Sequence, residues 1–342
     1  MELAKTNNCQ SRLQAIEQIY IMQNTVISSE IVKAEALRLG FSACGIAPAV
    51  AVDTEYASYF SDWLQRGGNA GMGYMDNYKD LRLDPRLVLE DCKSVVCLAL
   101  NYYPARRLKS DQYQFAYYAY GKDYHDVMRH KLNELAAAIT TAFADILMKT
   151  RICVDTAPVL ERYWAQKAGI GWIGKNHNLI IPHHGSFFFL GEILIDQLVD
   201  NYDTPMSSHC GTCRRCLDAC PGTAIHEDGF FDASCCLSYL SIERRGDFNT
   251  DEARLMSHQP GDTPYIYGCD RCQLACPYNK NASPNSTEEF QPSELFLNMS
   301  HNDWKQLSHA DYQQIFKGSA VKRAKFEGLK RNIDNAGSDD ED

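Results

Sequence analysis

Apolar and polar positions follow one another along the first 200 residues in a way that predicts strands and helices in turn. Residues 94–100 and 186–195 are mostly apolar segments of strand length, and residues 151–155 form a shorter strand that ends in an acid. Residues 29–39 and 124–148 carry apolar side chains at steps of three and four, which predicts a short helix and a long one.

Glycine and proline mark where the predicted helices begin and end. Gly40 follows the first helix, at the left-handed position where helices often stop. A third helix should begin at Pro158 and end at Gly169. Strands that alternate with helices are typical of a three-layer α/β domain. We assign this domain to residues 28–204, after an N-terminal extension of residues 1–27.

The composition is that of an ordinary globular protein. With 342 residues, 45% hydrophobic and 23% charged, the chain can bury the cores of two domains. No apolar stretch is long enough to span a membrane, and the first 24 residues lack the apolar core of a signal peptide. Fourteen cysteines without an export signal fit a reducing compartment. We therefore expect a cytoplasmic protein with free thiols and no membrane partner.

The net charge of −10 opposes a nucleic-acid partner, but the charge is unevenly distributed. Residues 334–342 form an acidic tail at the end of the chain. Before it, in a helical segment of residues 285–333, apolar positions at helical spacing predict an amphipathic helix with a basic outer face. Its basic residues are Lys317, Lys322, Arg323, Lys325, Lys330 and Arg331. The sequence alone favours a solvated surface over a phosphate-binding one.

Two cysteine runs, each ending in Cys-Pro, carry the strongest chemical signal. The first places cysteines at 210, 213, 216 and 220, the C-x2-C-x2-C-x3-C-P spacing that holds cubane iron–sulfur clusters. The second run repeats this ending at 269, 272 and 276, but Ile266 stands where its first cysteine would be. Two clusters need eight thiolates. The eighth can come from Cys235 or Cys236, and the spacing does not choose between them.

The ligand sets follow from the way in which each cysteine run contributes thiolates to both clusters. Three thiolates of a run bind one cluster, and the Cys-Pro thiolate binds the other. One [4Fe–4S] cluster therefore takes Cys210, Cys213, Cys216 and Cys276. The other takes Cys220, Cys269 and Cys272, with Cys235 or Cys236. We assign residues 205–284 to this ferredoxin-like, electron-transferring domain.

Zinc and disulfides are the alternatives for these cysteines. Structural zinc sites usually present two separated Cys-x2-Cys pairs, whereas here four cysteines fall within eleven residues. A disulfide framework fits poorly in a long chain without secretory features. The iron–sulfur interpretation is therefore preferred.

Two further stretches gather polar residues. Residues 121–125 stand before the long helix, and residues 169–178 combine three glycines with Lys and Asn. Neither matches a phosphate loop or a dinucleotide motif. The Asp-x-His pair of the first stretch lacks the glycine of the cobalamin motif Asp-x-His-x-x-Gly, because that position is Met128. Asp155 ends a strand before a helix, so its local sequence supports a helix cap and a catalytic acid equally.

Longer motifs resemble those of epoxyqueuosine reductases. They stand in chain order at residues 121–125, 155–162, 167–175, 188–192, 236–243 and 267–277. The resemblance covers roughly residues 28–333. It implies a cytoplasmic, cobalamin-dependent enzyme with two [4Fe–4S] clusters, which removes the epoxide oxygen of epoxyqueuosine at the wobble position of tRNA. It also implies that Cys236 is the eighth thiolate.

The resemblance implies separate roles for the clusters, the cobalamin and an acidic side chain in the reaction. Clusters deliver electrons one at a time, reduced cobalamin is a strong nucleophile, and an acid must protonate the leaving oxygen. For this acid we predict Asp155, with a pKa raised by burial against the corrin. The predicted cobalamin contacts are Arg82, Lys122, Tyr124, Asp155, Lys175, Asn176, Asn178 and Tyr239.

The C-terminal part departs from the family pattern. Many family members continue into a helical-repeat domain that helps to grip tRNA, whereas here the resemblance fades after residues 318–332, so we expect only its first helices. Without most of that domain, the basic helix is favoured more strongly as a contact to tRNA phosphates. We expect a monomer that receives electrons from an unidentified low-potential donor. The alternatives are a reductive dehalogenase-like corrinoid reductase and a non-catalytic ferredoxin-like electron carrier.

Overall fold

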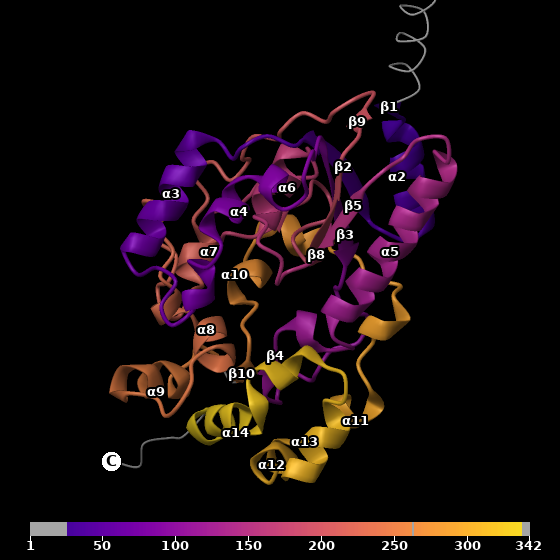
Figure 1. The fold of residues 1–342 in the computed structure, drawn as a ribbon. Helices are drawn as coiled ribbons and strands as arrows, with labels where there is room; N and C mark the ends of the chain where they lie inside the picture. Colours follow the sequence, from indigo (N-terminus) through magenta and orange to yellow (C-terminus); the bar gives the residue numbers. More distant parts are fainter. Residues whose placement is uncertain (1–25, 262, 337–342) are drawn as a thin grey trace, which may run out of the picture.

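A four-stranded sheet forms the centre of the first domain (Figure 1). The structure, a computed structural model, describes residues 26–261 and 263–336; most of the predicted N-terminal extension and the end of the acidic tail lie outside the described residues. The strands are β2 (Ala43–Pro48), β3 (Ser94–Asn101), β5 (Thr150–Cys153) and β8 (Phe188–Ile195). Their order is β2-β3-β8-β5, and every neighbouring pair is antiparallel.

Helices cover both faces of this sheet, as the three-layer prediction requires. Val96, Leu98 and Leu100 of β3 pack on one face with α2 (Ser29–Arg38) and α5 (Tyr124–Ala142). The alternate β3 residues pack on the other face with α3 (Thr54–Gln65) and α6 (Glu161–Lys167). Because strand side chains alternate between faces, the apolar run of β3 supplies both cores.

Two helix boundaries differ from the prediction, and two agree with it. Helix α5 ends at Ala142, six residues before position 148, and α6 begins at Glu161, three residues after Pro158. The residues between Pro158 and Glu161 form a tight turn instead, in which Val159 N–H donates to the Ala157 carbonyl. Gly40 (φ +86°) and Gly169 (φ +68°) adopt the predicted left-handed conformation.

Of three short strand pairs, two join distant parts of the chain and the third is a local hairpin. β1 (Val26–Ile27) pairs with β9 (Leu198–Val199), so the last two residues of the predicted N-terminal extension belong to the folded domain. β4 (Gln114–Phe115) pairs with β10 (Tyr265–Tyr267), which ties the first domain to the cysteine-rich region. β6 (Trp172–Ile173) pairs with β7 (Leu179–Ile180).

Short helices make up the rest of the molecule. Besides α4 (Lys79–Leu83), they are α7 (Arg215–Asp218), α8 (Leu237–Ile242), α9 (Thr250–Ser257), α10 (Arg271–Leu274), α11 (Glu294–Leu297), α12 (His301–Lys305), α13 (His309–Ile315) and α14 (Lys325–Asn335). The last four gather beside β4 and β10 (Figure 1) around an aromatic cluster of Phe115, Phe296, Trp304 and Phe316. No helix in the described part of the chain is long and apolar enough to cross a membrane.

Candidate active site

The cysteines of the two runs fold into two groups of four. Cys210, Cys213, Cys216 and Cys276 line one small cavity. Cys220, Cys236, Cys269 and Cys272 lie on the wall of a second, larger cavity. Each run therefore sends its Cys-Pro cysteine to the other group, and this grouping agrees with the ligand sets predicted from the crossing rule.

Cys236 belongs to the second group, whereas Cys235 does not line that cavity. The Cys235 thiol points instead to the carboxylate of Asp232, 3.7 Å away. Ile266, at the place of the missing cysteine, is fully buried in β10 and contributes to the apolar core. In the second run, the position that corresponds to the first cysteine of the first run is therefore part of a strand.

The donor set fits two iron–sulfur clusters. Burial raises the pKa of the Cys269 thiol to about 12 and that of Cys272 well above its ordinary value. Such buried thiolates need a metal beside them. In the described residues no three His, Cys, Asp or Glu side chains lie close enough to share a single ion. The thiols of each group stand instead around a cavity, and four thiols per group is the number that a cubane requires.

The larger cavity, of about 590 Å³, lies between the α/β domain and the second cysteine group. Helix α3 and the loop after it supply an apolar wall that consists of Tyr56, Tyr59, Phe60, Trp63, Met72 and Met75. The turn after β5 adds Asp155, and the start of α6 adds Glu161. A candidate proton donor and four candidate cluster ligands therefore line the same space.

Asp155 faces a histidine that is fixed between two carboxylates. Oδ2 of Asp155 lies 3.0 Å from Nε2 of His125, and Oδ1 of Asp123 lies 2.6 Å from Nδ1 of the same ring. Asp123 is the N-cap of α5 and also accepts the backbone N–H of His125, at 3.1 Å. A helix start thus sets the orientation of the imidazole ring.

These contacts decide where the proton lies. Hydrogen bonds to Asp123 and Asp155 raise the pKa of His125 to about 9, so the ring is an imidazolium at neutral pH. Burial alone would raise the pKa of Asp155, but the hydrogen bond from His125 and its positive charge lower it below its ordinary value. The prediction that Asp155 itself has a raised pKa is therefore wrong for this structure. The proton rests on His125, next to Asp155.

The backbone of Asp155 is held in an unusual conformation. Its φ of +46° lies in the left-handed region, which residues other than glycine seldom adopt. Its N–H donates to Oε1 of Glu161 at 2.6 Å. Leu160, and not Asp155, is the N-cap of α6, and the Asp155 side chain is 47% exposed on the cavity side. The helix-cap interpretation of Asp155 is therefore wrong.

Some of the predicted cofactor contacts gather around Asp155. Tyr124, Asn176 and Asn178 line the same cavity. Arg82 is buried nearby, and its guanidinium donates to the carbonyls of Tyr74 and Asn77. Burial lowers the pKa of Arg82, and the charges of Asp155 and Glu161 act in the opposite direction. Arg82 therefore holds the loop before α4, at the edge of the cavity.

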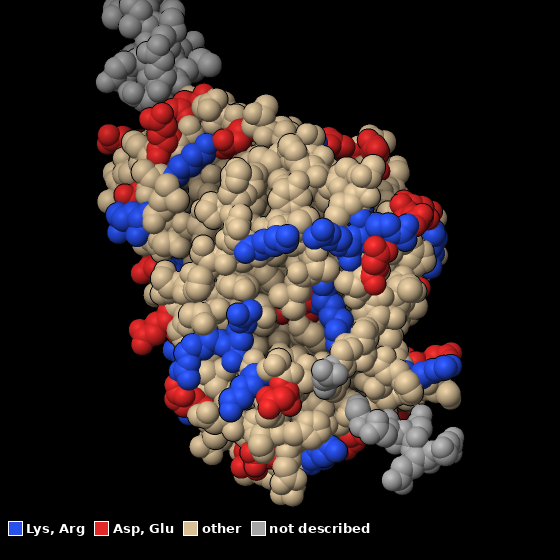
Figure 2. Space-filling view, turned by 180° about the vertical axis from the view of Figure 1, so that it is seen from behind, with Lys and Arg blue, Asp and Glu red and all other residues tan. Residues whose placement is uncertain are grey.

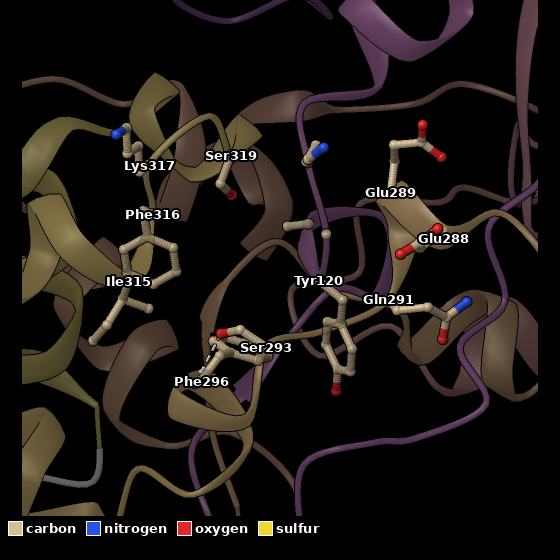
Figure 3. A pocket seen from close by; sticks show the side chains of 13 residues that line it. Tyr120, Glu288, Glu289, Gln291, Ser293, Phe296, Ile315, Phe316, Lys317 and Ser319 are labelled. Carbon is tan, nitrogen blue, oxygen red and sulfur yellow. Dashed lines mark hydrogen bonds between the residues drawn. The ribbon is translucent and has the colours of Figure 1, made fainter.

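Three other predicted contacts lie elsewhere. Lys175 Nζ donates to the carbonyls of Gly211 and Cys213, beside the first cysteine group. The hydroxyl of Tyr239 accepts the N–H of Gly71 at 2.9 Å. Lys122 lines a separate pocket of about 450 Å³, in which Figure 3 shows Lys317 and Glu289 on opposite sides of Tyr120.

Sequence reasoning overlooked His125 and Glu161 as members of the site. The Asp-x-His pair of Asp123 and His125 lacks the glycine of the cobalamin motif, so its local sequence does not indicate a role. Glu161 stands six residues after Asp155 in one of the family-like motifs, and no local pattern marked it as a partner of the Asp155 backbone.

Known proteins match this chain in sequence. Two family models match the chain: epoxyqueuosine reductase QueG, DUF1730, over residues 82–156, and the 4Fe-4S double cluster binding domain over residues 209–279. The chain is 42% identical over 306 residues to the epoxyqueuosine reductase of Cellulophaga algicola. The aligned region covers 90% of this chain and 97% of the relative. It is 44% identical over 305 residues to that of Leadbetterella byssophila, with 89% and 97% covered. The chain belongs to the epoxyqueuosine reductase family.

Solved structures of epoxyqueuosine reductases share this fold. A crystal structure of epoxyqueuosine reductase with an epoxyqueuosine-modified tRNA-Tyr stem loop matches with a TM-score of 0.79 and 26% identity, over 90% of this chain and 80% of that one. A selenomethionine-labelled epoxyqueuosine reductase matches with a TM-score of 0.77. Family membership favours the tRNA-modifying reductase over the dehalogenase and electron-carrier alternatives.

In the basic C-terminal segment of the chain, several of the basic side chains already have partners. Helix α14 begins at Lys325, after a short 3-10 turn. Arg323 pairs with Glu243 at 2.7 Å, Lys330 with Asp334 at 2.6 Å, and Arg331 donates to three backbone carbonyls. The predicted basic outer face is thus reduced to the exposed residues Lys317, Lys322 and Lys325.

Proposed function

We propose that this protein reduces epoxyqueuosine to queuosine in tRNA, with cobalamin bound in the cavity between the α/β domain and the second cysteine group. The observation that carries the proposal is that Asp155 and four grouped thiols line one cavity. When bound, cobalamin supplies a strongly nucleophilic metal and the two [4Fe–4S] clusters supply single electrons. The chain itself must then bind the cofactor and the tRNA, orient the epoxide and protonate the leaving oxygen.

The lining of the cavity suits a corrin. Its α3 wall is aromatic and apolar, as a flat macrocycle requires. Asn176 and Asn178 offer side-chain amides that can pair with polar groups at the edge of the ring. His177 also lines the cavity; its Nε2 is buried without a hydrogen-bond partner among the described residues, and burial lowers its pKa to about 4. A neutral imidazole nitrogen is therefore available to a ligand.

Asp155 and His125 supply the proton. Nε2 of His125 transfers its proton to Oδ2 of Asp155, and the leaving epoxide oxygen takes that proton from Oδ2. A ligand that fills the cavity removes water from Asp155 and thereby raises the pKa of its carboxyl, so the transfer from His125 becomes easier. Asp123 remains charged and keeps the ring in position. Complete removal of the oxygen consumes two electrons and two protons.

The proposal also covers the tRNA contacts, the electron donor and the cellular compartment. Lys317, Lys322 and Lys325 are exposed at the C-terminal segment and can contact tRNA phosphates. The face shown in Figure 2 carries Lys and Arg side chains in a band across its middle and in a group in its lower half, with Asp and Glu at its edges and beside some of these cations. We further propose that the protein works as a cytoplasmic monomer and receives electrons from a low-potential donor.

Anaerobic reconstitution tests the proposal directly. The protein is loaded with iron, sulfide and cobalamin, and its visible and EPR spectra are recorded before incubation with tRNA that carries epoxyqueuosine. We expect two cluster signals, a bound corrinoid and conversion to queuosine on nucleoside analysis. Conversion that is unaffected by omitting cobalamin would contradict the cofactor assignment, and protein that binds both cofactors without conversion would contradict the substrate.

A further inference from the structure

Glu192 is a buried acid for which the mechanism above has no use. It lies in the middle of β8 and has no exposed surface. Its neighbours across the sheet are Cys97 on β3 and Cys153 on β5, both in the core beneath α6. Neither carboxyl oxygen of Glu192 has a hydrogen-bond partner among the described residues. A carboxylate in such a place would be neither solvated nor paired.

No cation among the described groups compensates Glu192. The titratable groups that face it from the neighbouring elements are Cys97, Cys153 and Glu161. Burial, with the charge of Glu161, raises the pKa of Glu192 well above its ordinary value. Burial also raises the pKa of the Cys153 thiol to about 12, so this neighbour remains neutral. Glu161 is therefore the group nearby that can carry a negative charge.

Glu161 links this buried acid to the proton donor. Its Oε1 accepts the N–H of Asp155 at 2.6 Å, which holds Asp155 in the left-handed conformation. Burial and the charge of Asp155 raise the pKa of Glu161 to about 7. The charged groups around Glu161 are Asp155, Arg162, His125 and Arg82. A further negative charge behind Glu161 would repel both Glu161 and Asp155.

We propose that Glu192 retains a proton at working pH and so allows Glu161 to hold Asp155 in its reactive position. Glu192 is a positioning residue, one layer below the site, and this inference rests on the proposed function of Asp155. The three carboxyl groups then differ in protonation state. Asp155 is charged beside His125, Glu161 titrates near neutral pH, and Glu192 is neutral.

Infrared spectra of the reconstituted full-length protein test where the proton lies. At a pH well above the pKa of about 7 of Glu161 and Asp270, wild type should still show the carbonyl stretch of a protonated, buried carboxyl group, and Glu192→Gln should lose it. Glu134→Gln is the matched control, since Glu134 is an exposed glutamate of α5 whose loss should leave the band unchanged. A spectrum without the band in wild type overturns the proposal, and it does so even if Glu192→Gln fails to fold.

Thermal unfolding gives a second measurement. A folded-state pKa above the unfolded one contributes stability below the unfolded pKa, and this stability is lost as pH rises through the folded pKa. Wild type should therefore lose more Tm than Glu192→Gln between about pH 6 and about pH 9. Equal losses in the two proteins overturn the proposal.

Activity tests whether a neutral side chain at position 192 supports turnover. Glu192→Gln, which imitates the protonated acid, should retain kcat to within about twofold at neutral pH, whereas Glu161→Gln should lose about 10-fold or more with KM unchanged. The pH profile of kcat should also lose an ionisation near 7 in Glu161→Gln. A Glu192→Gln enzyme as slow as Asp155→Asn overturns the proposal. If no variant converts epoxyqueuosine, the proposed function fails, while the infrared and unfolding results still decide the state of Glu192.

Discussion

Nε2 of His125 lies 3.0 Å from Oδ2 of Asp155, although thirty residues separate them in the chain. The contact joins the start of α5 to the turn after β5, at the rim of the cavity that the second cysteine group also lines. It lets a carboxylate with a lowered pKa act as an acid, because the proton that it delivers is stored on the neighbouring ring.

Asp155→Asn keeps the shape of the side chain but removes the proton relay. We expect turnover to fall by about 100-fold or more, the usual weight of a general acid. Iron content and corrinoid binding should remain those of wild type, because Asp155 is not among the proposed cluster ligands and Asn has nearly the same size. Single-turnover conversion of modified tRNA measures the effect. A variant with normal turnover would place the acid elsewhere.

His125→Asn should change the pH dependence as well as the rate. The pKa of His125 is raised from 6.5 to about 9, so its stabilising contribution is present below about 6.5 and is lost as pH rises through about 9. Wild type should therefore lose stability and turnover on the alkaline side, and the variant should be slower and lack that step. Thermal unfolding and kcat, both measured from about pH 6 to about pH 10, test this. Identical profiles for the two proteins would contradict the relay.

Cys236→Ser and Cys235→Ser form a matched pair. Cys236 belongs to the second group, and Cys235 points to Asp232. Iron in reconstituted wild type should approach about eight atoms per chain, and it should remain there in Cys235→Ser. In Cys236→Ser it should fall toward about four, with the loss of one EPR signal. The opposite order would show that the two neighbours exchange roles.

The three exposed lysines of the C-terminal segment are expected to contact tRNA. Changing Lys317, Lys322 and Lys325 together to Glu should weaken tRNA binding and flatten its salt dependence, by roughly 0.7 to 0.9 in the log–log slope for each lost contact. Lys330→Gln is the control, because Lys330 already pairs with Asp334. Equal affinities and slopes for wild type and the triple variant would make this surface a merely solvated one.

Local features of the sequence were enough to predict most elements and to propose the cluster ligands. The apolar run of β3 is typical of a buried strand. The steps of three and four residues between successive cysteines are a property of two short segments, which include α7 and α10. Gly40 and Gly169 stop their helices because each tolerates a positive φ. These features depend on neighbouring residues alone, so periodicity and spacing reveal them.

The tertiary structure decided the relationships between distant segments. Strand order, the antiparallel sheet and the separate pocket of Lys122 leave no local pattern. The His125–Asp155 contact reverses the expected direction of the Asp155 pKa, because a charge from another helix outweighs the burial of the carboxyl. In the sequence, Glu192 is a single acidic residue within an otherwise apolar strand, and nothing local indicates its role. Only the packing of α6 over the sheet brings Glu161 near it and leaves it without a compensating cation, since such electrostatic effects depend on separation in space and not along the chain.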